Sequence, residues 1–249
     1  MSDRGTVLVT GATSGIGEAA ALALAEDGWW VAASGRDPER GGDVARRLGD
    51  RGTFVAADLT EEGAPDRLVA DVVATRGGLR ALVNNAAIYD RATLAELPTE
   101  QLDAILAADL RAPILLARAA VREMVARGGG VIVNVSSEAG IAAVPGQVAY
   151  NVAKAGLNML TRSIAVDHAQ DGVRAVSVCP GTTRTPLVEA AIAAASDPAA
   201  HERSLAEGRP AGRLGRVEEI AAAIRFAVSE EAAFMTGTEL VIDGGYTAA

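Results

Sequence analysis

The residues with the clearest capacity for chemistry are Tyr150 and Lys154. Lys154 is the only lysine in a chain of 249 residues whose other strongly basic side chains are all arginines. It follows Tyr150 by four positions, so a helix over this stretch would place both side chains on one face. An ammonium beside a phenol stabilises the phenolate and makes the tyrosine a better general acid or base. The spacing predicts a proton-transfer pair, and the alternative is an amphipathic helix with a packed tyrosine.

Two serines upstream of this pair, Ser136 and Ser137, lie at the end of a predicted strand. That strand and the helix expected to carry Tyr150 are consecutive elements, so their ends should lie close together. A serine hydroxyl there could donate a hydrogen bond to a substrate carbonyl oxygen. The residues alone leave both serines open as the donor, and both could simply begin a turn.

A glycine-rich turn follows the first predicted strand and precedes the first predicted helix. Its glycines, Gly11, Gly15 and Gly17, have the spacing G-x-x-x-G-x-G, which differs from the common G-x-G-x-x-G fingerprint of dinucleotide-binding proteins. Glycine lets a backbone approach a ligand closely, and free N–H groups at a helix N-terminus attract a pyrophosphate. Glycines also merely end strands, but the position between strand and helix favours dinucleotide binding.

The end of the second predicted strand bears on which dinucleotide is bound. NAD sites usually place an acidic residue there, on the ribose 2′-hydroxyl, but this chain has Gly35 followed by Arg36. A guanidinium suits a 2′-phosphate through its charge and its paired N–H groups. We therefore expect NADP(H) in preference to NAD(H). The alternative is that Arg36 is only solvated and that the neighbouring Asp37 repels a phosphate.

Short apolar runs alternate with longer segments of helical periodicity along the chain. We expect strands at 6–10, 30–34, 53–57, 79–84, 131–136, 174–179 and 239–242, and helices at 15–27, 38–48, 61–75, 99–127, 148–170 and 217–228. Continuous apolar strands separated by helices are typical of a parallel sheet covered on both faces. The sequence predicts an α/β fold, one doubly wound domain over 1–249 with a parallel sheet of about seven strands. The least regular stretch, 182–216, is a candidate substrate lid.

Composition and charge narrow the class of protein. The formal net charge is -9, so a nucleic-acid partner, which requires a basic face, is not expected. His168 and His201 lack metal-ligand spacing, so no metal site is predicted. The single cysteine, Cys179, allows no intrachain disulfide and favours a reducing compartment, the cytoplasm. We expect neither a signal peptide nor a membrane span, because no apolar run has the required length and flanks.

Together these motifs resemble those of the short-chain dehydrogenase/reductase family in its compact form. The resemblance spans essentially the whole chain, and several motifs in the family's order are specific where any one would be weak. It implies a Rossmann-type fold and an oxidoreductase that moves a hydride between a nicotinamide cofactor and a carbonyl or alcohol. The motifs are the turn 10–17, Asp58-Leu59, Asn84-Asn85-Ala86-Ala87, Ser137, Tyr150 with Lys154, Pro180-Gly181, Thr236-Gly237 and Asp243-Gly244-Gly245.

The resemblance also implies roles for individual residues. Tyr150 would be the acid/base, and Lys154 would hold the nicotinamide ribose and tune Tyr150. Ser137 lies thirteen residues before Tyr150, the family's spacing, which selects it over Ser136. The residues expected to bind cofactor, besides Tyr150 and Lys154, are Gly11, Ser14, Gly15, Ile16 and Gly17 at the phosphates, Arg36 at the 2′-phosphate, Asp58 and Leu59 at the adenine, Asn85 and Ala86 at the ribose, Pro180 and Gly181 after the sixth strand, and Thr183 and Thr185 at the carboxamide.

Family members are commonly homotetramers, so the resemblance also implies a homo-oligomer, a tetramer or a dimer. The long fourth and fifth helices and the C-terminal strand would form the interfaces. These assignments leave the small-molecule carbonyl or alcohol substrate unidentified. The candidate substrate contacts are Tyr89, Glu138, Ile141, Gln147 and Arg184, together with the lid. Glu138 could contact a polyol or an amine, or could face water.

One position departs from the family pattern. The family usually has an asparagine in the middle of the fourth helix, where it is thought to hold a water that joins the lysine to solvent, and Asp109 stands in its place. A carboxylate would favour a charged Lys154 but would partly cancel its effect on Tyr150. The hypothesis is an altered proton relay with a higher pH optimum. Asp109 also leaves an alternative function possible, that of a catalytically weak, cofactor-binding regulatory protein. An epimerase or dehydratase fits less well, because such relatives tend to be longer.

Overall fold

The computed structural model describes residues 4–249 and contains a central parallel sheet of seven strands. The strand order is β3-β2-β1-β4-β5-β6-β9, so the direction of winding reverses between β1 and β4, where such a sheet opens its ligand crevice. The predicted fold class is confirmed. The strands are β1 Thr6–Thr10, β2 Trp30–Gly35, β3 Gly52–Ala56, β4 Ala81–Asn84, β5 Gly130–Val135, β6 Val173–Pro180 and β9 Thr238–Ile242.

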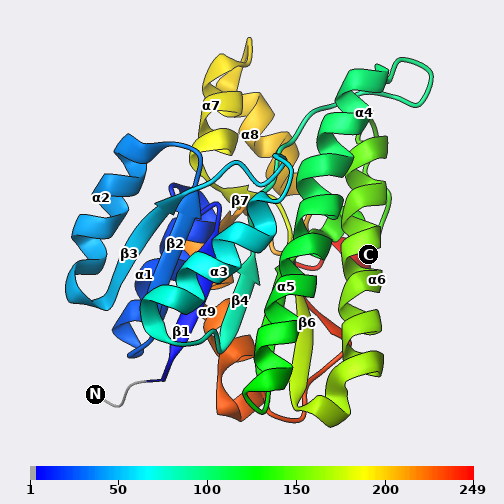
Figure 1. Ribbon diagram of the computed structural model, residues 1–249. Helices are drawn as coiled ribbons and strands as arrows, with labels where there is room; N and C mark the ends of the chain where they lie inside the picture. The colour runs from blue at the N-terminus through cyan, green and yellow to red at the C-terminus, as the bar shows by residue number, and fades with distance from the viewer. Residues whose placement is uncertain (1–3) are drawn as a thin grey trace.

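Helices cover both faces of the sheet (Figure 1). One apolar core lies between the sheet and α1 Gly15–Glu26, α2 Pro38–Leu48 and α9 Val217–Val228. The other core lies between the opposite face and α3 Ala64–Arg76, α5 Ala112–Ala126 and α6 Val148–His168. Because both faces are covered, the central strands are apolar on both sides, which explains the continuous apolar runs in the sequence. Short 3-10 turns lie at Gly49–Arg51, Glu138–Gly140, Ala169–Asp171, Glu230–Ala232 and Tyr246–Ala248.

A buried polar row interrupts the apolar sheet and fixes α6 against it. Asn84, Asn134 and Ser177 lie in register on β4, β5 and β6. Asn84 donates to the Oδ1 atom of Asn134 at 2.9 Å, and Asn134 donates to the hydroxyl of Thr161 in α6 at 2.8 Å. The Thr161 and Ser177 hydroxyls are 2.8 Å apart. Since an unpaired amide in a core is costly, these bonds hold α6 in one position relative to the strand ends.

The helix predicted over 99–127 is interrupted. The structure has α4 Thr99–Leu106, a π-helical turn Ala107–Arg111 and then α5. The backbone N–H of Ala112 bonds to the carbonyl of Ala107, five residues back. Pro113 supplies the physical reason, because it has no N–H to donate to the carbonyl of Asp109 four residues earlier. The extra residue in this turn is characteristic of functional sites in helices, and Asp109 lies within it.

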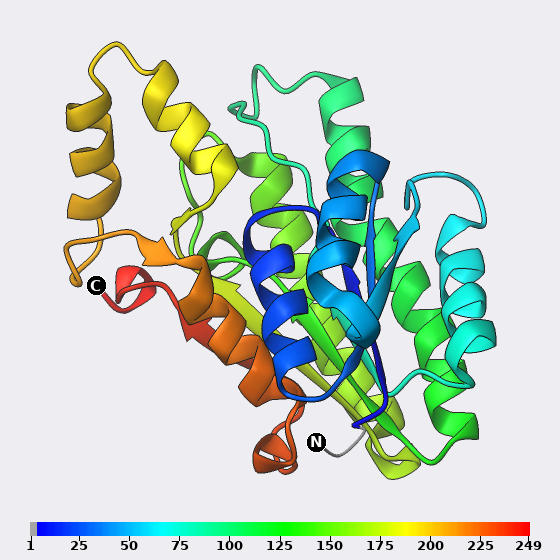
Figure 2. The ribbon, with the colours of Figure 1, turned by 90° about the vertical axis from the view of Figure 1, so that its left-hand side faces the viewer.

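The candidate lid contains regular structure that its irregular sequence pattern did not predict. It holds α7 Pro186–Ala194 and α8 Pro198–Glu207, and its two ends form a short parallel pair, β7 Thr183–Arg184 with β8 Gly215–Arg216. Figure 2 shows α7 and α8 as a hairpin that stands out from the body beyond the carboxyl ends of the strands. No helix within residues 4–249 combines the length and apolar character needed to cross a membrane.

Candidate active site

A cavity of about 360 Å³ is lined by the loops that follow β1, β2, β3 and β4. Three residues near the start of the lid, Thr185, Pro186 and Leu187, also line it. The structure therefore brings together most residues predicted to bind the cofactor. Those that line the cavity are Gly11, Ser14, Gly15, Ile16, Arg36, Asp58, Leu59, Asn85, Ala86 and Thr185.

The glycine turn is packed so tightly that side chains are excluded from it. A Cβ atom on Gly17 would lie 2.3 Å from the carbonyl oxygen of Gly11. Gly11 has a positive φ of 62°, and a Cβ atom there would lie 2.8 Å from the Cα of Ala86. Asn85 donates its side-chain amide to the carbonyl of Thr10 at 3.0 Å and ties β4 to the turn. The turn thus exposes backbone to the cavity, as a pyrophosphate site requires.

The part of the cavity beside the ends of β2 and β3 carries polar groups with spare hydrogen-bonding capacity. The Ser34 hydroxyl lines the cavity, is buried, and has no hydrogen-bond partner within residues 4–249. Asp58 accepts from the backbone N–H and the hydroxyl of Thr60, at 2.9 and 2.7 Å. These bonds lower the pKa of Asp58, so it presents a fixed carboxylate. An orphan buried hydroxyl, a fixed carboxylate and a side-chain-free turn fit a nicotinamide dinucleotide.

Arg36 lines the same cavity, and so do Asp37 and Arg40. The Asp37 carboxylate caps α2 by accepting the backbone N–H groups of Glu39 and Arg40, at 3.0 and 3.1 Å. It also accepts from the guanidinium of Arg40 at 2.6 Å. The bonds from Arg40 hold the pKa of Asp37 below its usual value. The negative charge of Asp37 is therefore already paired, which weakens its repulsion of a phosphate.

Tyr150 and Lys154 lie on the same side of α6, with the ammonium 5.3 Å from the centre of the phenol ring. The Nζ atom of Lys154 lies 3.4 Å from the Oδ2 atom of Asp109 and donates to the carbonyl of Val135 at 3.3 Å. The other carboxylate oxygen of Asp109 accepts the backbone N–H of Ile88 at 2.8 Å. The two charged side chains are 3% and 0% exposed, so the pair lies in a medium where charges interact strongly.

The electrostatics of this pair follow from burial and from its neighbours. Burial alone would lower the pKa of Lys154, but Tyr150 and Asp109 outweigh it and raise that pKa. Burial raises the pKa of Asp109, and this outweighs the opposing effects of Lys154 and of the Ile88 N–H. Lys154 is therefore a firmly charged ammonium, while Asp109 ionises less readily than a surface aspartate.

The structure distinguishes between the two serines. The Ser136 hydroxyl is buried and donates to the carbonyl of Lys154 at 3.0 Å. Ser137 is half-buried, and its oxygen accepts the backbone N–H of Ala139 at 3.1 Å, which leaves its hydroxyl proton free to donate. The turn after Ser137 packs directly on α6, since a Cβ atom on Gly140 would lie 2.8 Å from the carbonyl of Lys154. Ser137 is thus held near the pair by close backbone packing.

The predicted substrate contacts separate into two groups. Tyr89 packs edge-on against Tyr150 with 5.4 Å between ring centres, while Gln147 and Ile141 belong to the partly exposed segment before α6. Glu138, by contrast, does not face water: it is 6% exposed and forms an ion pair with Arg209. Burial raises the pKa of Glu138 to about 7, with Arg209 opposing the shift and Asp243 reinforcing it.

Arg184 lies apart from the other predicted contacts. It lines a separate cavity of about 470 Å³ on the lid, and its guanidinium is paired with Glu189 and Glu202. The predicted cofactor residues Gly17, Tyr150, Lys154, Pro180, Gly181 and Thr183 do not line the cavity of about 360 Å³. Thr183 is buried and donates to the carbonyl of Gly181 at 2.9 Å. Cys179 is fully buried, and burial raises the pKa of its thiol to about 12, so it is no nucleophile.

Several residues of the cavity were not predicted. They include Thr13, Ser34 and Arg40. Arg40 had a detectable signal, because it lies one helical turn after Asp37 and so can pair with it. Ser34 is a small residue at a strand end, and nothing in its sequence context predicts an unpaired hydroxyl. Within residues 4–249 there is no group of three potential metal-ligating side chains.

Comparisons with known proteins show which proteins this chain resembles. A family model described as Enoyl-(Acyl carrier protein) reductase matches residues 11–247. An uncharacterized oxidoreductase of Thermotoga maritima is 42% identical over 97% of this chain and 97% of the relative. The cis-4-hydroxycyclohexanecarboxylate dehydrogenase of Sinomonas cyclohexanicum is 42% identical over 97% and 96%, and the 2-(R)-hydroxypropyl-CoM dehydrogenase of Xanthobacter autotrophicus is 36% identical over 97% and 98%.

The match extends to three dimensions. A solved structure of a short chain dehydrogenase/reductase family protein has a TM-score of 0.89 and 38% sequence identity, with 99% of each chain covered. The similarity in sequence and structure therefore spans the glycine turn, the tyrosine–lysine helix and the lid together. The chain belongs to the short-chain dehydrogenase/reductase family of nicotinamide-dependent oxidoreductases.

Proposed function

We propose that this protein transfers a hydride between NADP(H) and a secondary alcohol or ketone, with Tyr150 as the general acid/base. The observation that carries the proposal is the position of Tyr150, Lys154 and Asp109 beside the dinucleotide cavity. Ile88 lines that cavity and also donates its backbone N–H to Asp109, so the buried charge pair adjoins the cofactor site. The dehydrogenase relatives support the reaction class.

The proposed mechanism assigns one task to each group. A bound nicotinamide supplies the hydride in reduction and accepts it in oxidation. Tyr150 gives its hydroxyl proton to the carbonyl oxygen in reduction and takes it back in oxidation. Ser137 donates a hydrogen bond to the same oxygen and stabilises its developing negative charge. The Lys154 ammonium stabilises the phenolate. Asp109 Oδ2 faces Lys154 and accepts no hydrogen bond within residues 4–249, so it is available to relay a proton.

The preference for NADP(H) rests on the guanidinium of Arg36 at the cavity and on the pairing of Asp37 with Arg40. We expect Arg36→Ala to lower the affinity for NADPH about 10- to 100-fold, which corresponds to the loss of charge-assisted hydrogen bonds of about 1.5–3 kcal/mol. The affinity for NADH should change little. Titration of both cofactors by fluorescence measures this, with Arg47→Ala as control, because Arg47 pairs with Glu18 instead. Equal losses for both cofactors would contradict the assignment.

Asp109→Asn tests the proposed relay. Removing the negative charge leaves the Lys154 ammonium unopposed, so the phenolate of Tyr150 becomes more stable and the pH–rate profile for oxidation should move to lower pH by on the order of one unit. Full pH profiles of kcat for wild type and variant measure the shift. Burial already raises the pKa of Asp109. An unchanged profile would mean that the carboxyl is neutral at working pH, and the altered relay would then be abandoned.

The substrate screen that tests the function should begin with cyclic secondary alcohols. Relatives include the cis-4-hydroxycyclohexanecarboxylate dehydrogenase and a cyclopentanol dehydrogenase. We propose testing such alcohols, with and without a carboxylate, and the matching ketones, using NADP(H) and NAD(H) in parallel. Turnover above the Tyr150→Phe background with at least one substrate is the expected result. Binding of cofactor without turnover of any alcohol or ketone would instead favour the regulatory alternative.

We also propose that the protein is a cytoplasmic homo-oligomer, a tetramer or a dimer. Apolar side chains recur every second turn along the outer face of α6, where Val152, Met159 and Val166 are 56%, 55% and 85% exposed. Ile114 and Val125 on α5 add exposed apolar surface. Exposed apolar side chains on two long helices favour association with another copy. Light scattering after size exclusion would give the number of subunits.

A further inference from the structure

The lid is tied to the rest of the protein near its two ends. Its two ends are linked by the pairing of β7 with β8 and by the bond from the Gly215 N–H to the carbonyl of Thr182, at 3.0 Å. Between these ends, α7 buries only Ile192 and α8 buries no residue. Two helices with so little buried surface cannot fix their own position against the sheet. The position of the lid is therefore set at its base, which we define as residues 182–184 and 208–216.

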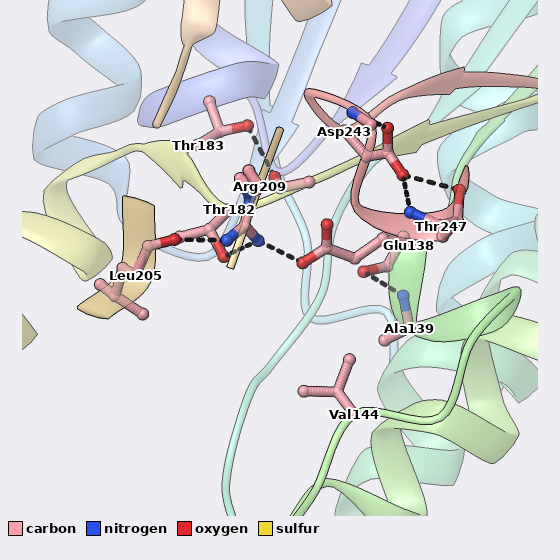
Figure 3. Close-up of polar contacts among 12 residues, drawn as sticks. Glu138, Ala139, Val144, Thr182, Thr183, Leu205, Arg209, Asp243 and Thr247 are labelled. Carbon is pink, nitrogen blue, oxygen red and sulfur yellow. Dashed lines mark hydrogen bonds and ion pairs between the residues drawn. The ribbon is translucent and has the colours of Figure 1, made fainter. Parts of the chain in front are cut away.

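Arg209 is the central residue of the lid base (Figure 3). It is only 6% exposed, and it forms an ion pair with Glu138. It also donates to the hydroxyl of Thr182 and to the carbonyl of Leu205, both at 2.5 Å. Its guanidinium stacks on the ring of Tyr246 with 5.2 Å to the ring centre. One side chain thus joins the beginning of the lid, the end of α8, the C-terminal turn and the residue beside Ser137.

Glu138 connects the lid base to the segment that carries Ser137. It follows Ser137 directly and begins the 3-10 turn whose Ala139 N–H bonds to the Ser137 hydroxyl oxygen. Its second carboxylate oxygen lies against Gly181, where a Cβ atom would come within 2.8 Å of it. A side chain at 181 would therefore displace the carboxylate, which gives Gly181 a role in packing that its motif alone did not reveal.

We propose that Arg209 is a positioning residue that holds the lid base in a fixed relation to Ser137 by binding Glu138 and Thr182 together. Its effect on turnover rests on the proposed function, because the lid would form one wall of the alcohol site. Glu138 Oε1 can accept from Arg209 whether or not the carboxyl is ionised. The anchor therefore depends on the donors of Arg209 more than on the charge of Glu138, although Asp243 and Arg209 both influence that charge.

The test compares three variants in the full-length protein. Arg209→Met removes the hydrogen-bond donors and keeps an unbranched side chain. Glu138→Gln keeps an acceptor for Arg209. Arg225→Met is the matched control, because it breaks a remote ion pair between α9 and Asp27. The first readout is the rate at which trypsin cuts after Arg203, an exposed residue of α8. The second is kcat and KM for the best alcohol of the screen. Should Arg209→Met fail to fold, the double variant Glu138→Gln/Arg209→Met, which leaves no unpaired charge, replaces it.

Arg209→Met should accelerate cleavage after Arg203 and lower kcat/KM about 10- to 100-fold, mainly through KM, because a displaced wall misplaces the substrate. Arg225→Met should stay within about 3-fold of wild type in both readouts. Glu138→Gln keeps an acceptor for Arg209 but removes its counter-charge, so it should fall between wild type and Arg209→Met in both readouts. A folded Arg209→Met or double variant with wild-type cleavage and wild-type KM would overturn the proposal. If the wild type turns over no alcohol, the proposed function fails, but the cleavage rates still decide whether Arg209 anchors the lid.

Discussion

Replacing Tyr150 by phenylalanine is expected to lower kcat by on the order of 10²- to 10⁴-fold, the usual contribution of a positioned general acid/base. Only the hydroxyl is lost. The ring keeps its edge-on contact with Tyr89, at 5.4 Å between ring centres, and its place beside the Lys154 ammonium, at 5.3 Å. The fold and the dinucleotide cavity should therefore survive, and the affinity for NADPH should stay close to that of wild type.

The measurement is kcat with NADPH and the best ketone of the screen, together with NADPH titration by fluorescence. Tyr246→Phe is the matched control, since it removes a phenolic hydroxyl while keeping the ring that stacks on Arg209. The control should retain wild-type kcat. If Tyr150→Phe also retains it, Tyr150 is not the acid/base and the proton must come from another group. If it loses NADPH binding as well, the loss of turnover says nothing about proton transfer.

The fold was predictable because its signals are local. Helices cover both faces of the sheet, so each central strand is a continuous apolar run. The position and length of each run in the sequence therefore locate the strand. The glycine turn was equally predictable. The close approach of Gly17 to the Gly11 carbonyl leaves no room for a side chain, so the position requires glycine. The four-residue spacing of Tyr150 and Lys154 needs only a helix, and α6 supplies one.

What could not be predicted depends on contacts between distant segments. Arg209 and Glu138 are 71 residues apart, and nothing near either residue indicates that they meet. The sequence therefore left open a solvent-exposed position for Glu138, whereas the structure buries it. The π-helical turn is an intermediate case. Pro113 marks where the helix must lose a hydrogen bond, but a proline near a helix start is also compatible with a new helix, so the residue types do not reveal that Asp109 turns toward Lys154.

Lys154→Met should affect both activity and stability. Loss of the ammonium removes the charge that stabilises the Tyr150 phenolate and a predicted contact to the cofactor ribose, so kcat/KM should fall by on the order of 10²- to 10⁴-fold. Asp109, which is 0% exposed, would lose its only ion-pair partner within residues 4–249. Breaking a buried pair in this way typically costs about 3–5 kcal/mol of unfolding free energy. Urea unfolding monitored by circular dichroism measures this cost.

The pH dependence of that loss has a definite sign. Burial already raises the pKa of Asp109 in the folded protein, and removing Lys154, which opposes the shift, raises it further. A group with a raised pKa in the folded state contributes stability at low pH that is lost as pH rises through the folded value. The deficit of Lys154→Met relative to wild type should therefore be small at acidic pH and should grow toward alkaline pH. A deficit independent of pH would mean that Asp109 does not ionise in the variant.

The double variant Lys154→Met/Asp109→Asn separates the two effects. It removes the charge that the single variant leaves unpaired, so it should recover much of the lost stability and its pH dependence should disappear. Activity should not recover, because neither an amide nor a thioether can stabilise the phenolate. Recovery of activity along with stability would show that Lys154 acts only by neutralising Asp109. Recovery of neither would indicate that the lost stability comes from the hydrogen bond of the Lys154 ammonium to the carbonyl of Val135, which both variants lack, and not from the unpaired Asp109.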